Sequence, residues 1–362
     1  MRPAKRQRRV PPTRTSKPTL GNRRSFALRL LWLAIPALVA ALAYYLFNGA
    51  DPHDLGINGP PFVVINLLGK GKGLVAARDI KQGELVIQEY PLFTVPKSIL
   101  ESPTTLISRL LQNVAPADRD AFMNLSYVHF PEGLDPDTHP EEVALAIFQT
   151  NAVAAGDGVG IFPRMARLNH GCSSAFNVVY SWRQREQALF VYALKNIPKG
   201  QELLTTYTDT KRTRKERREF LSQSYGFECT CAVCSLNDVA SKASDARLTA
   251  ISHHYSHLTT WGRRAIDGVE AIRTINKIWK LEDEEGYWSE RGRLAADGAW
   301  IAAAHSDVSA VRLWAQLAIK WYAYELGADS DLVSDVQRAT SQPEQHPAWG
   351  SREPLIVGAP VD

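Results

Sequence analysis

The longest apolar run of the chain is Leu30–Phe47, in which eighteen consecutive residues carry no charge. A helix that crosses a bilayer needs about 20 apolar residues at a rise of about 1.5 Å per residue, so residues 26–48 are long enough to span one. Aromatic side chains lie toward both ends of the run, at Trp32, Tyr44, Tyr45 and Phe47. Because membrane helices carry aromatic residues at both interfaces, the pattern predicts one transmembrane helix at 26–48.

Two other interpretations of this segment stay open. One is a cleavable signal peptide, although the basic region before the run is long and no clear A-x-A cleavage site follows it. The other is a buried helix of a soluble protein. The basic flank favours a cytosolic N-terminus, which places the remainder of the chain across the membrane, a poor place for free thiolates. We expect a single-pass membrane protein, with the secretory pathway after signal cleavage, or the cytoplasm or nucleus, as alternatives.

After a Pro- and Gly-rich linker at 49–61, short strands are predicted at Phe62–Ile65 and Gly73–Arg78, and a further strand ends at Pro91. The turn between the first two is Leu68–Gly73, where glycine occupies alternate positions. Such a turn lets the backbone approach a ligand closely, although a plain glycine-rich hairpin has the same pattern. No Gly-Lys-Ser/Thr opens a helix here, which excludes a Walker-type phosphate loop.

Residues 97–155 change to the helical spacing of apolar residues. The predicted helical segments are Ile99–Asn113, Asp118–Leu125 and Glu141–Ala154. Strand patterning returns over 161–207, with predicted strands at Val178–Trp182, Ala188–Leu194 and Glu202–Tyr207. A helical block of about 97–155 therefore interrupts two strand-rich blocks.

The C-terminal third is predominantly helical. The basic amphipathic stretch Lys211–Ser224 reads as a helix with a solvated charged face rather than a ligand-binding patch. A helical region follows at 237–340, and it contains two antiparallel helices joined at Ser306–Asp307, like a unit of a tetratricopeptide array. One unit is too few to establish a repeat domain. The Pro-rich residues 341–362 are expected to be a loose tail.

The charge of the chain is unevenly distributed. The net charge is +4, but the tail at 1–25, expected to be disordered, is basic and has no acidic residue, and the rest of the chain is slightly acidic. Composition is otherwise ordinary for a globular protein, and the length allows two domains and a tail. The overall charge therefore gives no reason to expect direct contact with nucleic acid.

The chain has four cysteines, too few for a disulfide scaffold at this length. Three of them form the motif Cys229-x-Cys231-x-x-Cys234, and Cys172 is the fourth. Three closely spaced thiolates favour tetrahedral zinc with one further ligand, so the motif predicts that Cys172 lies beside it in space. Reduced structural cysteines, or one disulfide with two spare thiols, remain as alternatives.

Asn169 and His170 are candidates because of their neighbours. An Asn-His pair alone is usually a loop cap or a satisfied core pair. This pair precedes Cys172, follows the glycine hairpin in the chain and is followed by Tyr207 at the end of a predicted strand.

The runs GKGLVAARDIKQGE, RLNHGC, NIPKGQELLTTY and YGFECTCAVC resemble, in this order, the motifs of SET-domain lysine methyltransferases over roughly residues 62–235. The helical insertion and C-terminal helices are most similar to the fungal and MYND-related branch, without a MYND finger because 97–155 contains no cysteine. The resemblance implies an α+β, β-rich SET fold at 62–210, a post-SET zinc segment at 211–236 and the C-terminal helical region, preceded by one transmembrane helix.

The same resemblance implies S-adenosylmethionine-dependent methyl transfer to a protein lysine. Cofactor contacts are implied for Lys70, Lys72, Gly73, Asn151, Asn169, His170 and Phe227. Tyr207 matches the catalytic tyrosine, and Tyr225 lines the lysine channel. A structural zinc ion is implied at Cys172, Cys229, Cys231 and Cys234. Expected partners are a substrate protein and, through 26–48, the membrane.

The sequence also departs from the family pattern. Ser174 and Ala175 stand where Pro-Asn usually follows the cysteine, an Asn comes only at Asn177, and Ala166 replaces a common serine. These differences leave the main cofactor and catalytic positions filled. They also support an alternative, a catalytically inactive SET module that acts as a scaffold or interaction protein through its C-terminal helices.

Overall fold

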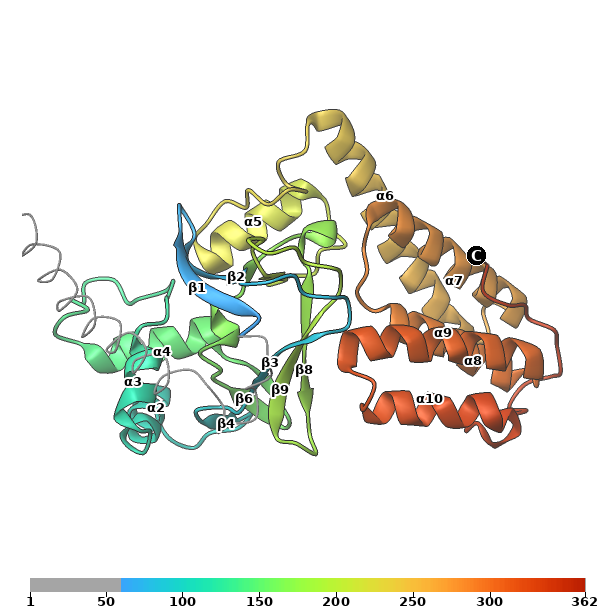
Figure 1. The fold of residues 1–362 in the computed structure, drawn as a ribbon, viewed down its shortest axis with the longest axis horizontal. Coiled ribbons are helices and arrows are strands. Elements are labelled where there is room, and N and C mark those ends of the chain that lie inside the picture. The colour runs from blue at the N-terminus through green and yellow to red at the C-terminus, as the bar shows by residue number, and fades with distance from the viewer. Residues whose placement is uncertain (1–59, 362) are drawn as a thin grey trace, which may run out of the picture. The chain divides into compact units, whose positions relative to one another are not determined.

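The computed structural model describes residues 60–361 (Figure 1). The predicted basic tail at 1–25, the predicted membrane helix at 26–48 and almost all of the linker at 49–61 lie outside these residues. Within 60–361, no helix has both the length and the apolar character needed to cross a bilayer.

The described chain begins with an antiparallel hairpin of β1 (Phe62–Leu67) and β2 (Gly71–Ala76). Gly69 and Gly71 in its turn have φ of +73° and +72°, a left-handed conformation that glycine adopts without a steric penalty. The glycine-rich hairpin predicted from the sequence is therefore confirmed.

Two three-stranded antiparallel sheets form the centre of the fold. The first has the order β3 (Leu85–Glu89), β9 (Ala188–Ala193), β8 (Val178–Arg183). Its middle strand β9 is buried along its whole length, as expected for a strand covered on both faces. The second sheet has the order β4 (Thr94–Pro96), β6 (Gly158–Gly160), β5 (Val153–Ala155).

The helical insertion consists of α2 (Pro103–Gln112), α3 (Pro116–Met123) and α4 (Pro140–Asn151). Each helix begins with proline, whose missing N–H costs nothing in the first turn. Their apolar faces share a core that includes Phe122 and Ile147. The three predicted helices are confirmed, each within a few residues of its predicted ends.

A short parallel pairing lies beside the sheets. β7 (Asn169–His170) pairs with β10 (Leu204–Thr205), with Leu204 opposite Asn169 and Thr205 opposite His170. The predicted strand Glu202–Tyr207 is thus only two residues long, and Tyr207 lies beyond its end. A 3-10 turn precedes β7 (η1, Met165–Arg167) and another follows it (η2, Ser173–Ala175).

Helix α5 (Arg214–Tyr225) leads into the cysteine segment. Thr213 and Glu216 form a reciprocal capping box at its N-terminus, which satisfies two otherwise free backbone donors. Gly226 ends the helix in the left-handed conformation.

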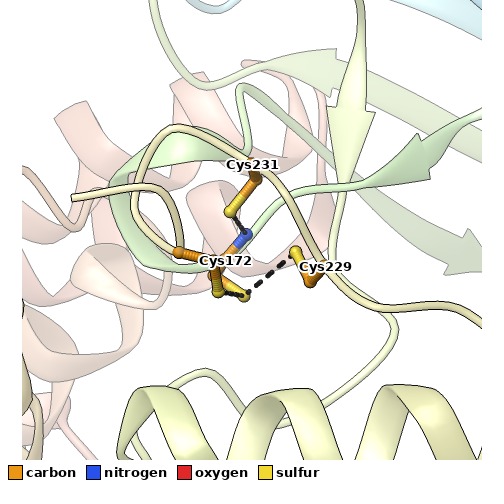
Figure 2. A group of neighbouring side chains, drawn as sticks. Cys172, Cys229 and Cys231 are labelled. Carbon is orange, nitrogen blue, oxygen red and sulfur yellow. Dashed lines mark hydrogen bonds between the residues drawn. The ribbon is translucent and has the colours of Figure 1, made fainter. Parts of the chain in front are cut away.

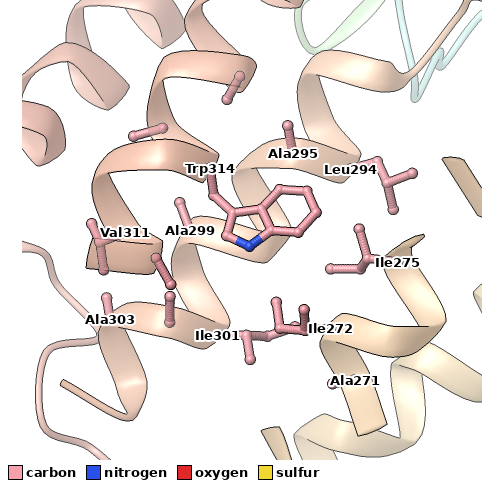
Figure 3. Packing of buried hydrophobic residues seen from close by; sticks show 14 of the residues in the cluster. Ala271, Ile272, Ile275, Leu294, Ala295, Ala299, Ile301, Ala303, Val311 and Trp314 are labelled. Carbon is pink, nitrogen blue, oxygen red and sulfur yellow. The ribbon is translucent and has the colours of Figure 1, made fainter. Parts of the chain in front are cut away.

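The helical region contains α6 (Asp238–Leu258), η3 (Thr259–Arg263), α7 (Gly268–Glu285), α8 (Arg291–Ala304), α9 (Val308–Leu326), α10 (Asp331–Ser341) and η4 (Pro343–Gln345). The predicted helix pair joined at Ser306–Asp307 is confirmed as α8 and α9. Asp307 caps α9 by accepting from Ala310 N at 3.1 Å. Trp314 of α9 lies at the centre of this core, among small residues of α8 such as Ala295 and Ala299 (Figure 3).

The prediction of a loose tail at 341–362 is wrong for the residues that the structure describes. Ala348 and Val357 are buried, and Arg352 N donates to Ala304 O at 2.9 Å. Trp314 Nε1 donates to Gly358 O at 3.1 Å. The last carbonyls of a helix need external donors, and the extended tail supplies them to α8.

The indole of Trp314 leaves no room for a side chain at Gly298, in the middle of α8. A Cβ at Gly298 would lie 2.5 Å from Trp314 Cδ2. We expect Gly298→Ala to lower the free energy of unfolding by about 1–3 kcal/mol, because overpacking outweighs the helix propensity of alanine. Chemical denaturation would measure this change. Gly262→Ala is the matched control, since a Cβ there meets no atom within 4 Å, and an equal loss in both variants would contradict the packing argument.

Candidate functional site

A cavity of about 490 Å³ opens where the hairpin turn, the end of α4, β7 and the cysteine segment converge. Eight of the predicted cofactor and catalytic residues line it: Lys70, Lys72, Asn151, Asn169, His170, Tyr207, Tyr225 and Phe227. Gly73 is not among the lining residues and lies behind Asn169. A Cβ at Gly73 would approach Asn169 Nδ2 to 2.7 Å, so glycine there leaves room for the asparagine amide.

One side of the cavity is organised by Glu202. Its carboxylate accepts from Lys70 Nζ at 2.6 Å and from Asn169 Nδ2 at 2.9 Å. It therefore joins the hairpin turn to β7 and fixes the orientation of the asparagine amide. Sequence reasoning missed Glu202, because its only signal was a position within a predicted strand.

Asn151 lies at the C-terminal end of α4. Its amide nitrogen donates to Ser126 O at 2.7 Å and to Ile147 O at 2.8 Å. Both amide protons are thus used, and the side-chain oxygen remains as an acceptor at the cavity wall. Arg167, also missed from the sequence, lines the same cavity, and burial lowers the pKa of its guanidinium.

His170 is buried, and both ring nitrogens have defined partners. Nδ1 accepts from Tyr207 N at 3.0 Å, so the proton of the neutral ring is on Nε2, which faces Cys172 Sγ at 3.1 Å. Burial lowers the pKa of His170 to about 4, which keeps the imidazole neutral near pH 7. His170 therefore ties the backbone of Tyr207 to the cysteine cluster.

Tyr207 is held by its hydroxyl and its ring. The hydroxyl donates to Leu168 O at 2.6 Å, and the ring lies 4.9 Å from that of Tyr225 and 5.4 Å from that of His170. Burial raises the pKa of Tyr207 above its ordinary value, so the hydroxyl is protonated and acts as a donor rather than a base. Tyr180 of β8, a third tyrosine in the cavity, was not predicted.

The four cysteines lie together and are buried, and Figure 2 labels three of them, Cys172, Cys229 and Cys231. Their sulfurs all lie within 4.8 Å of one another, with Cys172 Sγ 3.6 Å from Cys234 Sγ and 4.0 Å from Cys229 Sγ. Zinc–sulfur bonds of about 2.3 Å in a tetrahedron separate the sulfurs by roughly 3.8 Å. The predicted adjacency is confirmed, and the donor set fits one structural zinc ion.

Helix α5 supports this cluster from one side. Arg218 donates from Nε to Cys229 O at 3.2 Å and from Nη2 to Cys234 O at 3.0 Å. Arg217 is fully buried, and the neighbouring cysteines Cys172 and Cys234 help to raise its pKa against the effect of burial. The interpretation of this helix as a solvated charged face is therefore wrong for Arg217, whereas Arg218 is partly exposed. Four thiolates around zinc carry a net negative charge, which Arg217 compensates.

The structure places the residues after Cys172 that differ from the family pattern. Ser174 and Ala175 lie in η2, and Asn177 comes next to β10. Its amide donates to Glu202 O at 2.9 Å and accepts from Leu204 N at 2.8 Å. Asn177 thus holds the backbone at the start of β10. Ala166 lines the cavity without offering a hydroxyl.

Comparison with known proteins identifies residues 71–208 as matching the SET domain family. Histone-lysine N-methyltransferase set5 of Schizosaccharomyces pombe is 26% identical over 82% of this chain and 87% of its own length. Histone-lysine N-methyltransferase SMYD3 of Mus musculus is 36% identical over 24% of this chain, a match that spans 20% of that protein. A solved structure described as the SET domain of LSMT bound to lysine and AdoHcy is 10% identical over 89% of this chain and 92% of its own, with a TM-score of 0.35.

The cysteine cluster predicts the metal content of the protein. We expect metal analysis to find about one zinc per chain, and Cys231→Ser to lose most of it because only three thiolates remain. Thr230→Ser is the matched control, since Thr230 lies between two of the ligands with an exposed side chain. Wild-type protein with almost no zinc and with oxidised cysteines would contradict the assignment.

Proposed function

We propose that this chain, whose residues 71–208 match the SET domain family, transfers a methyl group from S-adenosylmethionine to the side chain of a protein lysine. One observation carries the proposal. The protonated hydroxyl of Tyr207, the amide of Asn169 and the ring of His170 line the same cavity, so a cofactor and an entering amine would meet there.

The cavity suits S-adenosylmethionine in size and chemistry. Its volume of about 490 Å³ lies within the roughly 300–1,000 Å³ of small-molecule sites. Lys70 and Lys72 would face the carboxylate of the cofactor, the free oxygen of Asn151 would accept from its amino group, and Phe227 offers an apolar face. When bound, the cofactor supplies an electrophilic methyl group on a sulfonium.

The protein's own contribution is positioning and desolvation. A lysine that enters between Tyr207, Tyr225 and Tyr180 exchanges water for aromatic surface, which disfavours its ammonium form and lowers its pKa. The Tyr207 hydroxyl can orient the neutral amine without taking its proton, because burial raises the pKa of this phenol. Methyl transfer then depends on alignment and electrostatics rather than on an ionised catalytic base.

The zinc cluster has a supporting role in this proposal. Phe227 lies two residues before Cys229, and Tyr225 is the last residue of α5. A zinc ion bound to Cys172 would fix this segment over the cavity. Attachment to a membrane through 26–48 rests on the sequence alone and stays a prediction.

Cofactor binding is the first prediction of the proposal. Calorimetric titration of S-adenosylmethionine into the zinc-loaded protein should give micromolar affinity, and Asn169→Ala should weaken it about 10-fold, the effect of one lost buried hydrogen bond. Asn66→Ala is the control, because Asn66 is exposed on β1. A folded, zinc-loaded protein that binds no S-adenosylmethionine would favour the inactive scaffold instead.

Turnover depends on the Tyr207 hydroxyl in this scheme. We expect Tyr207→Phe to reduce methyl transfer to a lysine substrate by about 10²-fold or more while the cofactor affinity is kept. Tyr90→Phe provides the matched control, since Tyr90 is 58% exposed and does not line the cavity. Transfer of radioactive methyl groups under single-turnover conditions measures the effect, and unchanged turnover in Tyr207→Phe would overturn the role given to this residue.

A further inference from the structure

The segment that follows Cys172 has a strained backbone. Ser173 has φ of +44°, in the left-handed region that L-residues other than glycine rarely adopt. The residue is 1% exposed. A non-glycine residue keeps such a conformation only where its surroundings determine it, so the contacts of Ser173 identify what holds this loop.

The partner of Ser173 comes from the helical region. Ser173 Oγ donates to Glu285 Oε1 at 2.8 Å, and Glu285 is the last residue of α7. Ser244 of α6 donates to the same oxygen at 2.6 Å, and Arg247 Nε donates to Oε2 at 2.9 Å. The buried carboxylate thus has partners at both oxygens and joins two helices to the loop beside a zinc ligand.

Neighbouring contacts reinforce this junction. Lys195 donates to Ser174 O, and its Nζ lies 3.5 Å from Gly286 O. Phe176 meets Tyr287 edge to face, with ring centroids 5.7 Å apart. Both rings belong to a buried cluster that also contains Leu194 and Leu248. The loop is therefore packed against α6 and the end of α7 through Ser173 and Phe176.

The loop is directly continuous with the functional site. Cys172 precedes Ser173 in the chain, its N–H donates to Cys231 Sγ at 3.5 Å, and its sulfur faces His170 Nε2. Any relaxation of Ser173 toward an ordinary φ would rotate the peptide that links it to Cys172. The residue bonded to Glu285 is therefore adjacent to a predicted metal ligand and three to four residues from His170 and Asn169.

We propose that Glu285 is a positioning residue for the segment 169–172, so that the helical region forms an integral part of the zinc and cofactor site. The part that concerns S-adenosylmethionine rests on the proposed function, whereas the part that concerns loop order and metal retention does not. The helices are in this view required for the geometry of the site.

Two variants remove the junction in different ways. Glu285→Gln keeps the size of the side chain but places an amide where Arg247 and the two serines require acceptors. Ser173→Ala removes only the bond from the loop and leaves the pairing of Glu285 with Ser244 and Arg247. Glu284→Gln is the matched control, because Glu284 is the exposed neighbour on the same helix.

The measurements use the full-length, zinc-loaded protein at a temperature where circular dichroism finds each variant folded. We expect both variants to release zinc to a chelator about 10-fold faster, because the residue next to Cys172 loses its partner and groups that support a metal ligand have effects of this size, and to exchange the amide hydrogens of 169–177 faster. S-adenosylmethionine should bind about 10-fold more weakly. Glu285→Gln should add little in the Ser173→Ala background, since the two residues act through one contact.

The possible outcomes distinguish a positioning role of Glu285 from a contribution to overall stability alone. If the melting temperature falls in both variants while zinc release, amide exchange and cofactor affinity match the wild type, the proposal is overturned. If Glu285→Gln fails to fold, Ser173→Ala decides by the same readouts. If wild-type protein binds no S-adenosylmethionine, the proposed function fails, and zinc release and exchange still decide the role of Glu285.

Discussion

A neutral imidazole links Tyr207 to the cysteine cluster. His170 accepts the backbone N–H of Tyr207 on one nitrogen and faces the sulfur of Cys172 with the other. A charged ring would donate from both nitrogens and lose the first bond, so the pKa lowered by burial is a condition of the geometry. Through this ring, the two-residue pairing of β7 with β10 is connected to the cysteine cluster.

The parts that the sequence could predict are those with a local signal. The glycine hairpin, the three helices of the insertion and the α8–α9 pair follow from spacing within about ten residues. The cysteine cluster joins distant residues, yet a rare residue type with a strict metal geometry made it predictable. The order of the motifs gave the resemblance to the family, and the resemblance in turn gave eight cofactor and catalytic residues that line the cavity.

The rest depended on contacts between segments far apart in the chain, made by residues of common type. Glu202 and Glu285 are ordinary acidic residues until the fold places Asn169 and Ser173 beside them. The Pro-rich end of the chain has no apolar periodicity, so nothing local indicated that its backbone would satisfy the end of α8. Arg217 lies in a charge run whose pattern gave no sign of which residue is buried.

The bond between Ser173 and Glu285 joins residues 112 positions apart, which has a consequence for biosynthesis. At roughly 5–20 residues per second, translation needs about 6–22 s to pass from one to the other. During that interval the strand-rich half of the chain exists without the helices that enclose its loop, and Cys172 is a lone thiol until its three companion ligands emerge. A ribosome-bound intermediate therefore exposes the thiol of Cys172 to oxidation before the other three cysteines can join it around a metal ion.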